Sequence, residues 1–155
     1  MTPAITLLKK KRISHSLHQY KHDPQASSYG LEAAEKLQLD PRQVFKTLVV
    51  ELDNRKLAVA IIPVKAMLNM KRIAKAAGAK KAQMAEPKRV EKSTGYILGG
   101  VSPLGQKKRL PTAIDISAEE FPTIYISAGK RGLDIEIQPG DLAMLTEAKF
   151  AQLSD

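Results

Sequence analysis

The sequence predicts a single α/β domain of the α+β type, spanning residues 1–155, in which peripheral helices pack on a mixed β-sheet. Its 155 residues suit one domain, and no internal repeat or Gly/Ser linker divides the chain. Hydrophobic residues make up 43% and charged residues 26%, as in ordinary globular proteins, which excludes disordered and collagen-like chains. Helical and strand patterns alternate irregularly and hairpins are frequent, so the order argues against a doubly wound parallel fold.

The chain opens on a helix. Thr2 fits the N-cap position and Pro3 the first helical position, and Ile5 and Leu8 follow at helical spacing. Basic residues at 9–12 close this helix, where they suit the negative end of its dipole. The next predicted elements are a strand at Ser16–Tyr20, a polar loop at His22–Ser28 and a helix at Leu31–Leu39 that ends at Asp40-Pro41.

The strongest strands form a hairpin in the first half of the chain. Phe45–Leu52 and Lys56–Pro63 are rich in β-branched and apolar residues, and Asp53-Asn54-Arg55 between them suits a tight turn. We expect the remaining elements, in order, to be a basic helix at Met70–Ala77 capped by Asn69 and ended by Gly78, a strand at Ala82–Met84, a basic helical turn at Glu86–Lys92, a glycine-rich connector at Gly95–Gly105, strands at Ala113–Ile116, Thr123–Ser127 and Leu133–Ile137, and a helix at Asp141–Thr146.

The positive charge is concentrated in one segment. The chain has 25 Lys and Arg against 16 Asp and Glu, a net charge of +9. Between Lys65 and Arg109 there are twelve Lys and Arg but two acidic residues, whereas the rest of the chain carries a net charge of −1. Such a basic stripe favours binding to a phosphate backbone, although a lysine-rich surface that serves solubility explains the charge equally well.

Several classes of site and location are excluded. Without a cysteine the chain has no disulfide, thiolate zinc site or thiol nucleophile of its own. The connector matches neither a Walker loop nor GxGxxG, and no GxSxG elbow is present. His15, His18 and His22 lie close together without carboxylates at metal-ligand spacing, so we expect neither metal nor cofactor. No membrane span or signal peptide is found, and the expected location is cytoplasmic.

Lys46 has an unusual position. Strand alternation places it on the same face as Leu48 and Val50, while Phe45 and Val49 face the other side. A strand that is apolar on both faces is central in its sheet, and a lysine there needs a polar pocket or an anionic partner. The alternative is that Lys46, at the start of the strand, simply reaches solvent, and the pattern alone favours this alternative.

The segment Gly99-Gly100-Val101-Ser102-Pro103 is a candidate binding loop. Its glycines let the backbone approach a ligand closely, and its amide groups are donors for a carbonyl or a carboxylate. Taken alone, such a segment is more often a plain turn.

A second loop, Ser127–Gly132, lies between two predicted strands. It places Lys130 and Arg131 in a turn that either clamps a phosphate or forms an exposed hairpin tip. Asp134 lies within the following strand, an unusual place for an acid, although half-exposed strands often carry one. Tyr20, at the end of the first strand, either offers a hydrogen-bonding phenol or caps the core.

Taken together, these segments resemble one family. The segments that carry the resemblance are, in chain order, Thr2-Pro3-Ala4, Val44-Phe45-Lys46-Thr47-Leu48, Lys92-Ser93-Thr94-Gly95-Tyr96, Gly99 to Arg109 and Ser127 to Asp134. Their order and spacing are similar to the YbaK/EbsC-type family of free-standing bacterial cysteinyl-tRNA(Pro) deacylases, relatives of the editing domain of bacterial prolyl-tRNA synthetase. The resemblance runs from Met1 to about Phe150 and implies one α/β domain with a barrel-like mixed sheet.

The resemblance also implies roles for individual residues. The family's essential lysine falls on Lys46, its first-strand tyrosine on Tyr20 and its strand acid on Asp134, and we take these as the catalytic residues. The residues implied to bind the substrate are Gly99, Gly100, Val101, Ser102, Pro103, Ser127 and Tyr29, the last standing where many relatives have phenylalanine. The residues that we expect to contact tRNA are Lys71, Arg72, Lys75, Lys107, Lys108, Arg109, Lys130 and Arg131.

The implied activity is trans-editing: removal of cysteine mischarged onto tRNA(Pro), with cysteinyl-tRNA(Cys) as a further substrate. A pocket separates cysteine from proline poorly because they are similar in size, so a second site must clear the error. No residue here is an evident nucleophile. The family's proposed route fits, because the substrate's own thiol attacks its carbonyl and leaves as a thiolactone, a lyase-like ester cleavage. Amides at 99–102 would hold the carbonyl oxygen and Asp134 the ammonium.

The implied partners are aminoacyl-tRNA(Pro) and prolyl-tRNA synthetase. Phosphate contacts do not distinguish one tRNA from another, so the synthetase would provide the selectivity for tRNA(Pro). Two alternatives stay open. One is a deacylase for another mischarged tRNA such as alanyl-tRNA(Pro), which needs a tighter pocket and no thiol. The other is a non-catalytic tRNA-binding module, in which Lys46 is only a phosphate contact.

Overall fold

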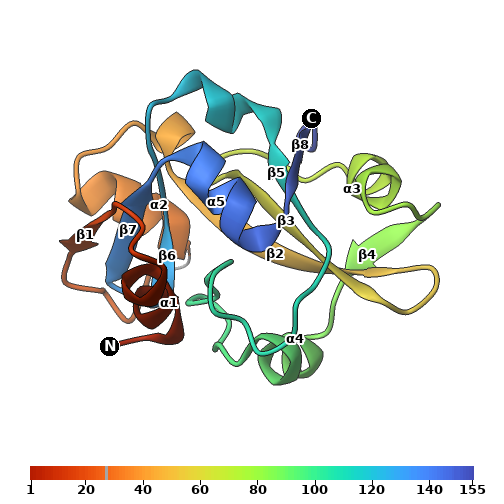
Figure 1. Ribbon diagram of the computed structural model, residues 1–155, viewed down its shortest axis with the longest axis horizontal. Helices are drawn as coiled ribbons and strands as arrows, with labels where there is room; N and C mark the ends of the chain where they lie inside the picture. The colour runs from red at the N-terminus through yellow and green to blue at the C-terminus, as the bar shows by residue number, and fades with distance from the viewer. Residues whose placement is uncertain (27) are drawn as a thin grey trace.

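The computed structural model describes residues 1–26 and 28–155 and has the predicted mixed α/β architecture, with helices around two β-sheets (Figure 1). The predicted loop at His22–Ser28 includes Ser27, which lies outside the described residues. The elements found are α1 (Pro3–Lys11), β1 (Ser16–Gln19), α2 (Tyr29–Lys36), the 3-10 turn η1 (Pro41–Gln43), β2 (Phe45–Leu52), β3 (Leu57–Pro63), α3 (Met70–Ala76), β4 (Ala82–Met84), α4 (Pro87–Thr94), β5 (Thr112–Asp115), the 3-10 turn η2 (Ile116–Glu120), β6 (Ile124–Lys130), β7 (Leu133–Ile137), α5 (Pro139–Thr146) and β8 (Lys149–Ala151).

The larger sheet has the order β4-β2-β3-β5-β8. β2 and β3 form the predicted antiparallel hairpin, whose turn ends at Arg55 in the left-handed region (φ 67°). β4 adds antiparallel to β2, whereas β5 and β8 add in parallel on the other side, which makes the sheet mixed. The interior place of β2 and β3 agrees with their apolar residues on both faces.

These two faces are covered by separate hydrophobic cores. Val49, Val59 and Ile61 face the main core, which also contains residues of α1, β6 and β7. Val50, Ala60, Ile62 and their neighbours face a second core, closed by Ile73 of α3 and by Leu153 near the C-terminus. The alternation along β2 and β3 therefore explains why β3 is almost wholly buried and why no residue of β2 is fully exposed.

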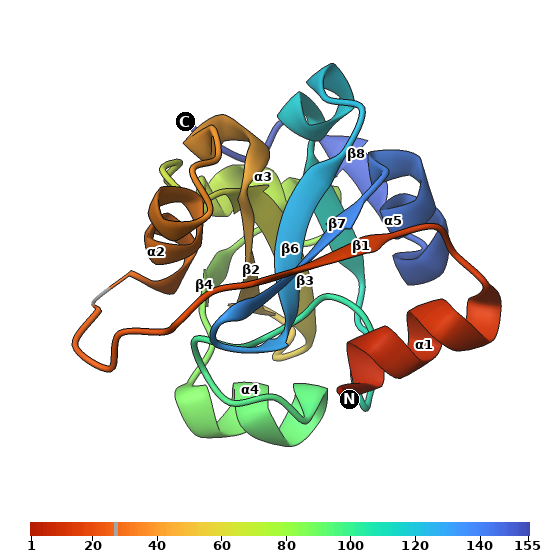
Figure 2. The same cartoon turned by 90° about the vertical axis from the view of Figure 1, so that its left-hand side faces the viewer.

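The smaller sheet has the order β1-β7-β6 and is antiparallel throughout. Figure 2 shows β1 crossing in front of β7 and β6, with α2 to one side. A single parallel bridge between Val44 and Tyr125 joins this sheet to the start of β2. A third core, formed by Ala33, Ala34, Val44, Val64 and Tyr125, fills the junction under α2. This junction is the frame of the site described below.

The helix ends confirm the predicted caps at two places. Thr2 precedes α1, and its hydroxyl accepts a hydrogen bond from the Ile5 amide at 3.3 Å. Asn69 precedes α3, and its side chain accepts from the Arg72 amide at 3.1 Å. By contrast, α2 begins two residues earlier than expected and ends at Lys36, so residues 37–39 are not helical.

Most other boundaries lie within two residues of the prediction, and the larger differences concern β6 and β8. β6 continues through Ser127 to Lys130, because a bulge with Gly129 at φ 108° extends its pairing with β7. β8 was not predicted from the sequence. It is stabilised by the buried Asp115 carboxylate, which accepts hydrogen bonds from the amides of Leu153 and Ser154 at 2.9 and 3.1 Å, just after the strand. None of the helices in the described part of the chain has the length and hydropathy needed to cross a membrane.

Candidate active site

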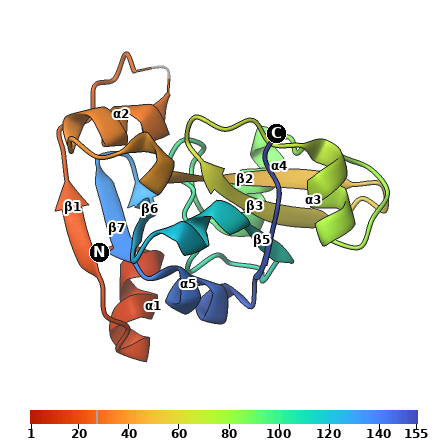
Figure 3. The ribbon, with the colours of Figure 1, turned by 90° about the horizontal axis from the view of Figure 1, so that it is seen from above.

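A cavity of about 280 Å³ lies where α2, the start of β2 and the β6–β7 hairpin meet. Figure 3 shows these elements gathered at one end of the molecule, away from α3. All three residues predicted to be catalytic line this cavity, together with several of the predicted binding residues. The lining residues are Tyr20, Ser28, Tyr29, Gly30, Ala33, Val44, Phe45, Lys46, Thr47, Leu48, Leu98, Gly99, Val101, Ser127, Lys130, Arg131 and Asp134.

Asp134 is the buried acid of the cavity. It lies in β7, paired with Ser127 on one side and His18 on the other, and only 6% of its surface is exposed. Burial raises the pKa of its carboxyl group to about 7, because a charge is costly where water is excluded. The cavity therefore offers a carboxyl group that gains stability when a cation enters beside it.

Tyr20 lies beside this acid, one residue beyond β1. Its amide donates to the Gly132 carbonyl at 2.9 Å, which continues the β1–β7 pairing by one step. Burial, with the negative charge of Asp134 as a second cause, raises the pKa of the phenol to about 12. At neutral pH the phenol is therefore a hydrogen-bond donor, as the prediction for Tyr20 requires.

Lys46 is the second residue of β2 and is half-buried, opposite Ile62 of β3. Burial lowers the pKa of its ammonium group, and within the described residues it forms no ion pair. Lys46 lies near the start of its strand and also lines the cavity, so it is neither fully in solvent nor enclosed in the core. An ammonium group with no protein partner is available to an anion or to developing negative charge.

Thr47 is a lining residue that the sequence reasoning missed. Its hydroxyl is buried and has no hydrogen-bond partner among the described residues. A buried polar atom without a partner costs free energy, so a ligand atom that bonds to it would be favoured. The available signal was a hydroxyl residue within an apolar strand, which is common for threonine and therefore uninformative.

Tyr29 forms one wall of the cavity, held between Gly99 and Arg131. The Arg131 guanidinium lies 3.9 Å from the centre of the Tyr29 ring and donates to the Leu98 carbonyl at 3.2 Å. A Cβ at Gly99, whose φ is 89°, would lie 2.4 Å from the ring edge of Tyr29. Only glycine allows this approach, so the connector, α2 and the β6–β7 turn are fixed together at this wall.

The predicted binding loop is divided by the structure. Gly99 and Val101 line the cavity, whereas Gly100, Ser102 and Pro103 do not. The amide of Gly100 donates to the Ile97 carbonyl at 2.9 Å, and Ser102 is fully buried, with its hydroxyl accepting from the Leu104 amide at 3.3 Å. A carbonyl-binding role in this loop is thus open to Gly99 and Val101.

Ser127 and Lys130 occupy the rim on β6. The Ser127 hydroxyl accepts a hydrogen bond from the Gly129 amide at 3.1 Å, which orients it across the bulge. Lys130 is exposed, and Arg131 is exposed as well despite its contact with Tyr29. The predicted clamp residues therefore do reach the cavity, but Arg131 is partly committed to holding its wall.

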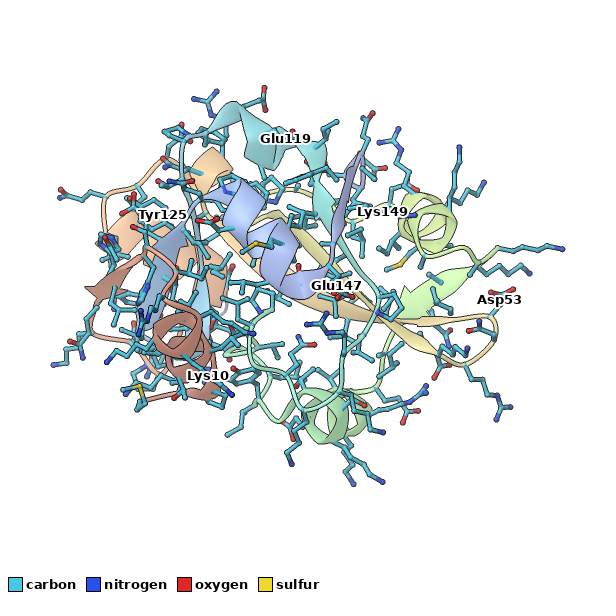
Figure 4. All side chains as sticks on the ribbon, in the orientation of Figure 1. Lys10, Asp53, Glu119, Tyr125, Glu147 and Lys149 are labelled. Carbon is cyan, nitrogen blue, oxygen red and sulfur yellow. The ribbon has the colours of Figure 1, made fainter. Side chains whose placement is uncertain are left out.

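The other cations predicted to contact tRNA lie outside the cavity. Lys71 and Lys75 are exposed on α3, while Arg72 donates to the Ser154 carbonyl. Figure 4 shows that α3 is far from the cavity. Tyr125, at the cavity end, and Asp53, at the tip of the β2–β3 hairpin near α3 and β4, lie toward opposite ends of the long axis. Lys107, Lys108 and Arg109 lie on the exposed segment after the connector, where Arg109 pairs with Glu147 at 2.7 Å.

The three histidines make separate contacts. His15 bonds to the Ile13 carbonyl at 2.7 Å, His18 to Glu136 at 2.9 Å, and His22 to Glu32 at 2.7 Å. Across residues 1–26 and 28–155, no three potential ligands come together in a way that could hold a metal ion. The histidines fasten β1 and the following loop to their neighbours.

Comparisons with known proteins give one consistent result. Residues 23–145 match the model of the aminoacyl-tRNA editing domain family. A protein of Enterococcus faecalis named "Putative Cys-tRNA(Pro)/Cys-tRNA(Cys) deacylase EbsC" is 42% identical over 121 residues, which cover 78% of this chain and 74% of that protein. The Bacillus subtilis protein YwhH, which is uncharacterized, is 33% identical over 69 residues, or 44% of each chain.

Solved structures share the fold over nearly the whole chain. A crystal structure described as a putative trans-editing enzyme for prolyl tRNA synthetase superposes with a TM-score of 0.81 at 22% identity, covering 98% of this chain and 92% of that one. A hypothetical protein superposes with a TM-score of 0.87 at 24% identity, covering 99% of both chains. At these identities the likeness establishes the fold.

Proposed function

Because the chain belongs to the aminoacyl-tRNA editing domain family, we propose that it is a trans-acting deacylase that removes cysteine from mischarged tRNA(Pro), and also acts on cysteinyl-tRNA(Cys). The relative named for these two substrates is 42% identical over the 121 aligned residues, which cover most of both chains. The observation that carries the proposal is the convergence of Tyr20, Lys46 and Asp134 on one cavity.

The cavity suits an aminoacyl ester, which carries an α-ammonium group beside a carbonyl group. The buried Asp134 carboxylate binds the α-ammonium group. Burial destabilises the charged carboxylate, and the positive charge of the ammonium group stabilises it again. In this proposal the amides of the lining residues Gly99 and Val101 bind the carbonyl oxygen, where negative charge develops during ester cleavage. Lys46 stabilises that charge or holds the terminal ribose and phosphate, and Tyr20 donates a hydrogen bond to the ester.

The reaction uses a nucleophile from the substrate. Among the described lining residues the hydroxyl groups of Ser127 and Thr47 have no basic partner that would activate them. In the proposed step the cysteine sulfur bonds to the carbonyl carbon, the ester C–O bond breaks, and the ribose oxygen takes the thiol proton. The cyclic thioester leaves and water opens it to free cysteine. Selectivity for cysteine then comes from its chemistry more than from cavity size.

The experiment is a deacylation assay with cysteine, serine and alanine esterified to the same tRNA. We expect rapid release of cysteine and slow release of serine, since a hydroxyl is a far weaker nucleophile than a thiol. Equal rates for serine and cysteine would contradict substrate-thiol attack. A rate for alanine above that for cysteine would identify an alanyl-tRNA(Pro) deacylase instead.

Further parts of the proposal concern partners and location. We propose that exposed cations of α3 and the connector contact the tRNA backbone, and that prolyl-tRNA synthetase supplies the choice of tRNA. We propose the cytoplasm as its location, because the tRNA substrate is aminoacylated there. The protein acts as one domain over residues 1–155, without metal or cofactor.

A further inference from the structure

A second hollow lies beside the cavity and is not used by the proposed reaction. This groove, of about 480 Å³, runs between the N-terminus at residues 1–3, the connector at Tyr96–Leu98, and Lys130 with Arg131. Leu98, Lys130 and Arg131 line both the groove and the cavity, so the two hollows share one wall. A polymer whose end lies in the cavity would meet this groove next.

The groove carries an apolar surface that is unusual for an exposed place. Met1 is 81% exposed, Ile97 73% and Leu98 40%. These are three of the eight large hydrophobic side chains that are exposed in the described part of the chain, and all three line this groove. Scattered apolar residues need no explanation, but a cluster beside a reactive cavity indicates a binding surface.

The walls of the groove are firmly built. The Thr2 hydroxyl donates to the Ala128 carbonyl at 2.5 Å, and the Tyr96 phenol donates to the Leu104 carbonyl at 2.6 Å. A Cβ at Gly129, whose φ is 108°, would lie 2.5 Å from the Tyr96 ring, so the bulge of β6 and the connector are in close contact. The apolar side chains are therefore held exposed by a rigid support.

Positive charge lies at both ends of this apolar surface. Lys130 and Arg131 are at the end shared with the cavity, and neither forms an ion pair with another described residue. At the other end the stem of Lys107 packs over Gly95, where a Cβ would lie 3.1 Å from it. Glu91 is the acid in contact with this region, through the Leu98 amide at 3.4 Å. Single-stranded nucleic acid binds where cations hold its backbone beside a surface that receives its bases. That surface is usually aromatic, and here it consists of the aliphatic side chains of Ile97 and Leu98.

We propose that the groove binds the unpaired nucleotide that precedes the aminoacylated terminal nucleotide of the tRNA. Its base lies against Ile97 and Leu98, and its phosphate lies at Lys130 and Arg131. This inference rests on the proposed function, because the ester in the cavity fixes where the strand begins. It predicts that part of the affinity for substrate comes from this one nucleotide, independently of the helical body of the tRNA.

The test compares two small substrates: cysteine esterified to adenosine, and cysteine esterified to the dinucleotide CpA. The variant is Ile97→Glu, and the matched control is Ile116→Glu, since Ile116 is similarly exposed at 51% but lies on η2, outside both hollows. Thermal melting of both variants checks the fold.

We expect Ile97→Glu to raise KM for the CpA ester about tenfold, with kcat unchanged, and to leave the adenosine ester unaffected. Equal losses on both esters, or no loss on the CpA ester, would overturn the groove proposal while the proposed function stands. A loss seen only with full tRNA and synthetase present would overturn it in favour of a protein-binding surface. If the unaltered protein cleaves neither ester nor cysteinyl-tRNA, both proposals fall.

Discussion

The charged side chains of two candidate catalytic residues are buried or half-buried at the cavity end of the molecule, whereas the lysines of α3 are exposed to solvent at the other end. At the cavity end, Asp134 is buried and Lys46 is half-buried. Burial raises the pKa of the Asp134 carboxyl group and lowers the pKa of the Lys46 ammonium group, so in both cases it favours the neutral form. At the α3 end, Lys71 and Lys75 are exposed on a helix at the opposite end of the molecule from α2, β6 and β7 (Figure 3). Charges excluded from water interact strongly with a ligand, whereas exposed charges act weakly, over a distance, and in a salt-dependent way. We expect the first region to determine rate and the second to determine affinity.

The largest expected effect comes from removing the ammonium group of the cavity. Lys46→Ala should lower the rate of cysteinyl-tRNA deacylation at least about 100-fold, because the variant lacks the ammonium group that stabilises the negative charge developing on the ester. Binding of the tRNA, measured by filter retention, should change little. The control is Lys65→Ala, an exposed lysine just after β3. Loss of tRNA binding in Lys46→Ala, from an unaltered protein that shows no deacylation, would instead support a non-catalytic tRNA-binding module.

The next largest effect concerns the buried acid. Asp134→Asn should lower kcat/KM about 10- to 100-fold, because the substrate ammonium then meets a neutral amide in place of a carboxylate. The same change should raise stability at pH 8. The pKa of the Asp134 carboxyl group is about 7 in the folded protein, whereas in the unfolded chain this group loses its proton near pH 4. The group therefore makes the fold progressively less stable as the pH rises from about 4 to about 7.

We therefore expect the free energy of unfolding of Asp134→Asn to exceed that of the unaltered protein by about 1 to 4 kcal/mol at pH 8. The gain should shrink to a small fraction of this at pH 4, where the carboxyl group is protonated in the folded state and about half protonated in the unfolded chain. Urea unfolding at the two pH values measures this difference. A stability gain that is the same at both would contradict the raised pKa.

A smaller effect is expected from the cavity wall. Gly99→Ala adds a methyl group 2.4 Å from the Tyr29 ring and should lower the deacylation rate about tenfold. Gly78→Ala is the matched control, because Gly78 also has a positive φ (77°) but faces open space beyond α3. Both variants lose about 1 kcal/mol of stability to the left-handed backbone. If both lose activity equally, the packing of Gly99 against Tyr29 has no part in the site.

The smallest effect on chemistry is expected at the basic helix. Charge reversal at Lys71, Arg72 and Lys75 together should weaken binding severalfold at moderate salt, whether the partner is tRNA alone or tRNA in complex with the synthetase. Hydrolysis at saturating substrate should persist. The slope of log affinity against log salt concentration should become shallower by about one for each phosphate that the variant no longer neutralises. Unchanged binding at moderate salt would show that α3 touches neither partner.

The sequence predicts the elements of the cavity end better than their arrangement. β2 and β3 follow from their apolar residues on both faces. For Lys46, strand alternation alone favours a side chain in solvent, and only the family resemblance suggested a place in a binding site. The division into two sheets, joined by the Val44–Tyr125 bridge, depends on pairing between distant residues and leaves no periodic signal. β8 has three residues, and its place depends on hydrogen bonds to the buried Asp115.

The site shows the same limit. Tyr20, Lys46 and Asp134 could be proposed from a resemblance, and the structure brings them to one cavity. Gly100 and Ser102 do not line the cavity, because of the path that the connector takes, and glycine content alone does not predict that path. The contact of Arg131 with Tyr29 joins residues about 100 positions apart, so charge alone suggested only a phosphate contact.

The most direct measurement is the single-turnover rate of cysteinyl-tRNA(Pro) deacylation at saturating protein, compared for Lys46→Ala and for the double variant Lys71→Glu/Lys75→Glu. We expect Lys46→Ala to lose at least about 100-fold in this rate, and the α3 variant to keep the rate of the unaltered protein once the protein concentration offsets its weaker binding. An α3 variant as slow as Lys46→Ala, or a Lys46→Ala protein at full rate, would contradict the assignment of chemistry to the cavity and affinity to the basic surface.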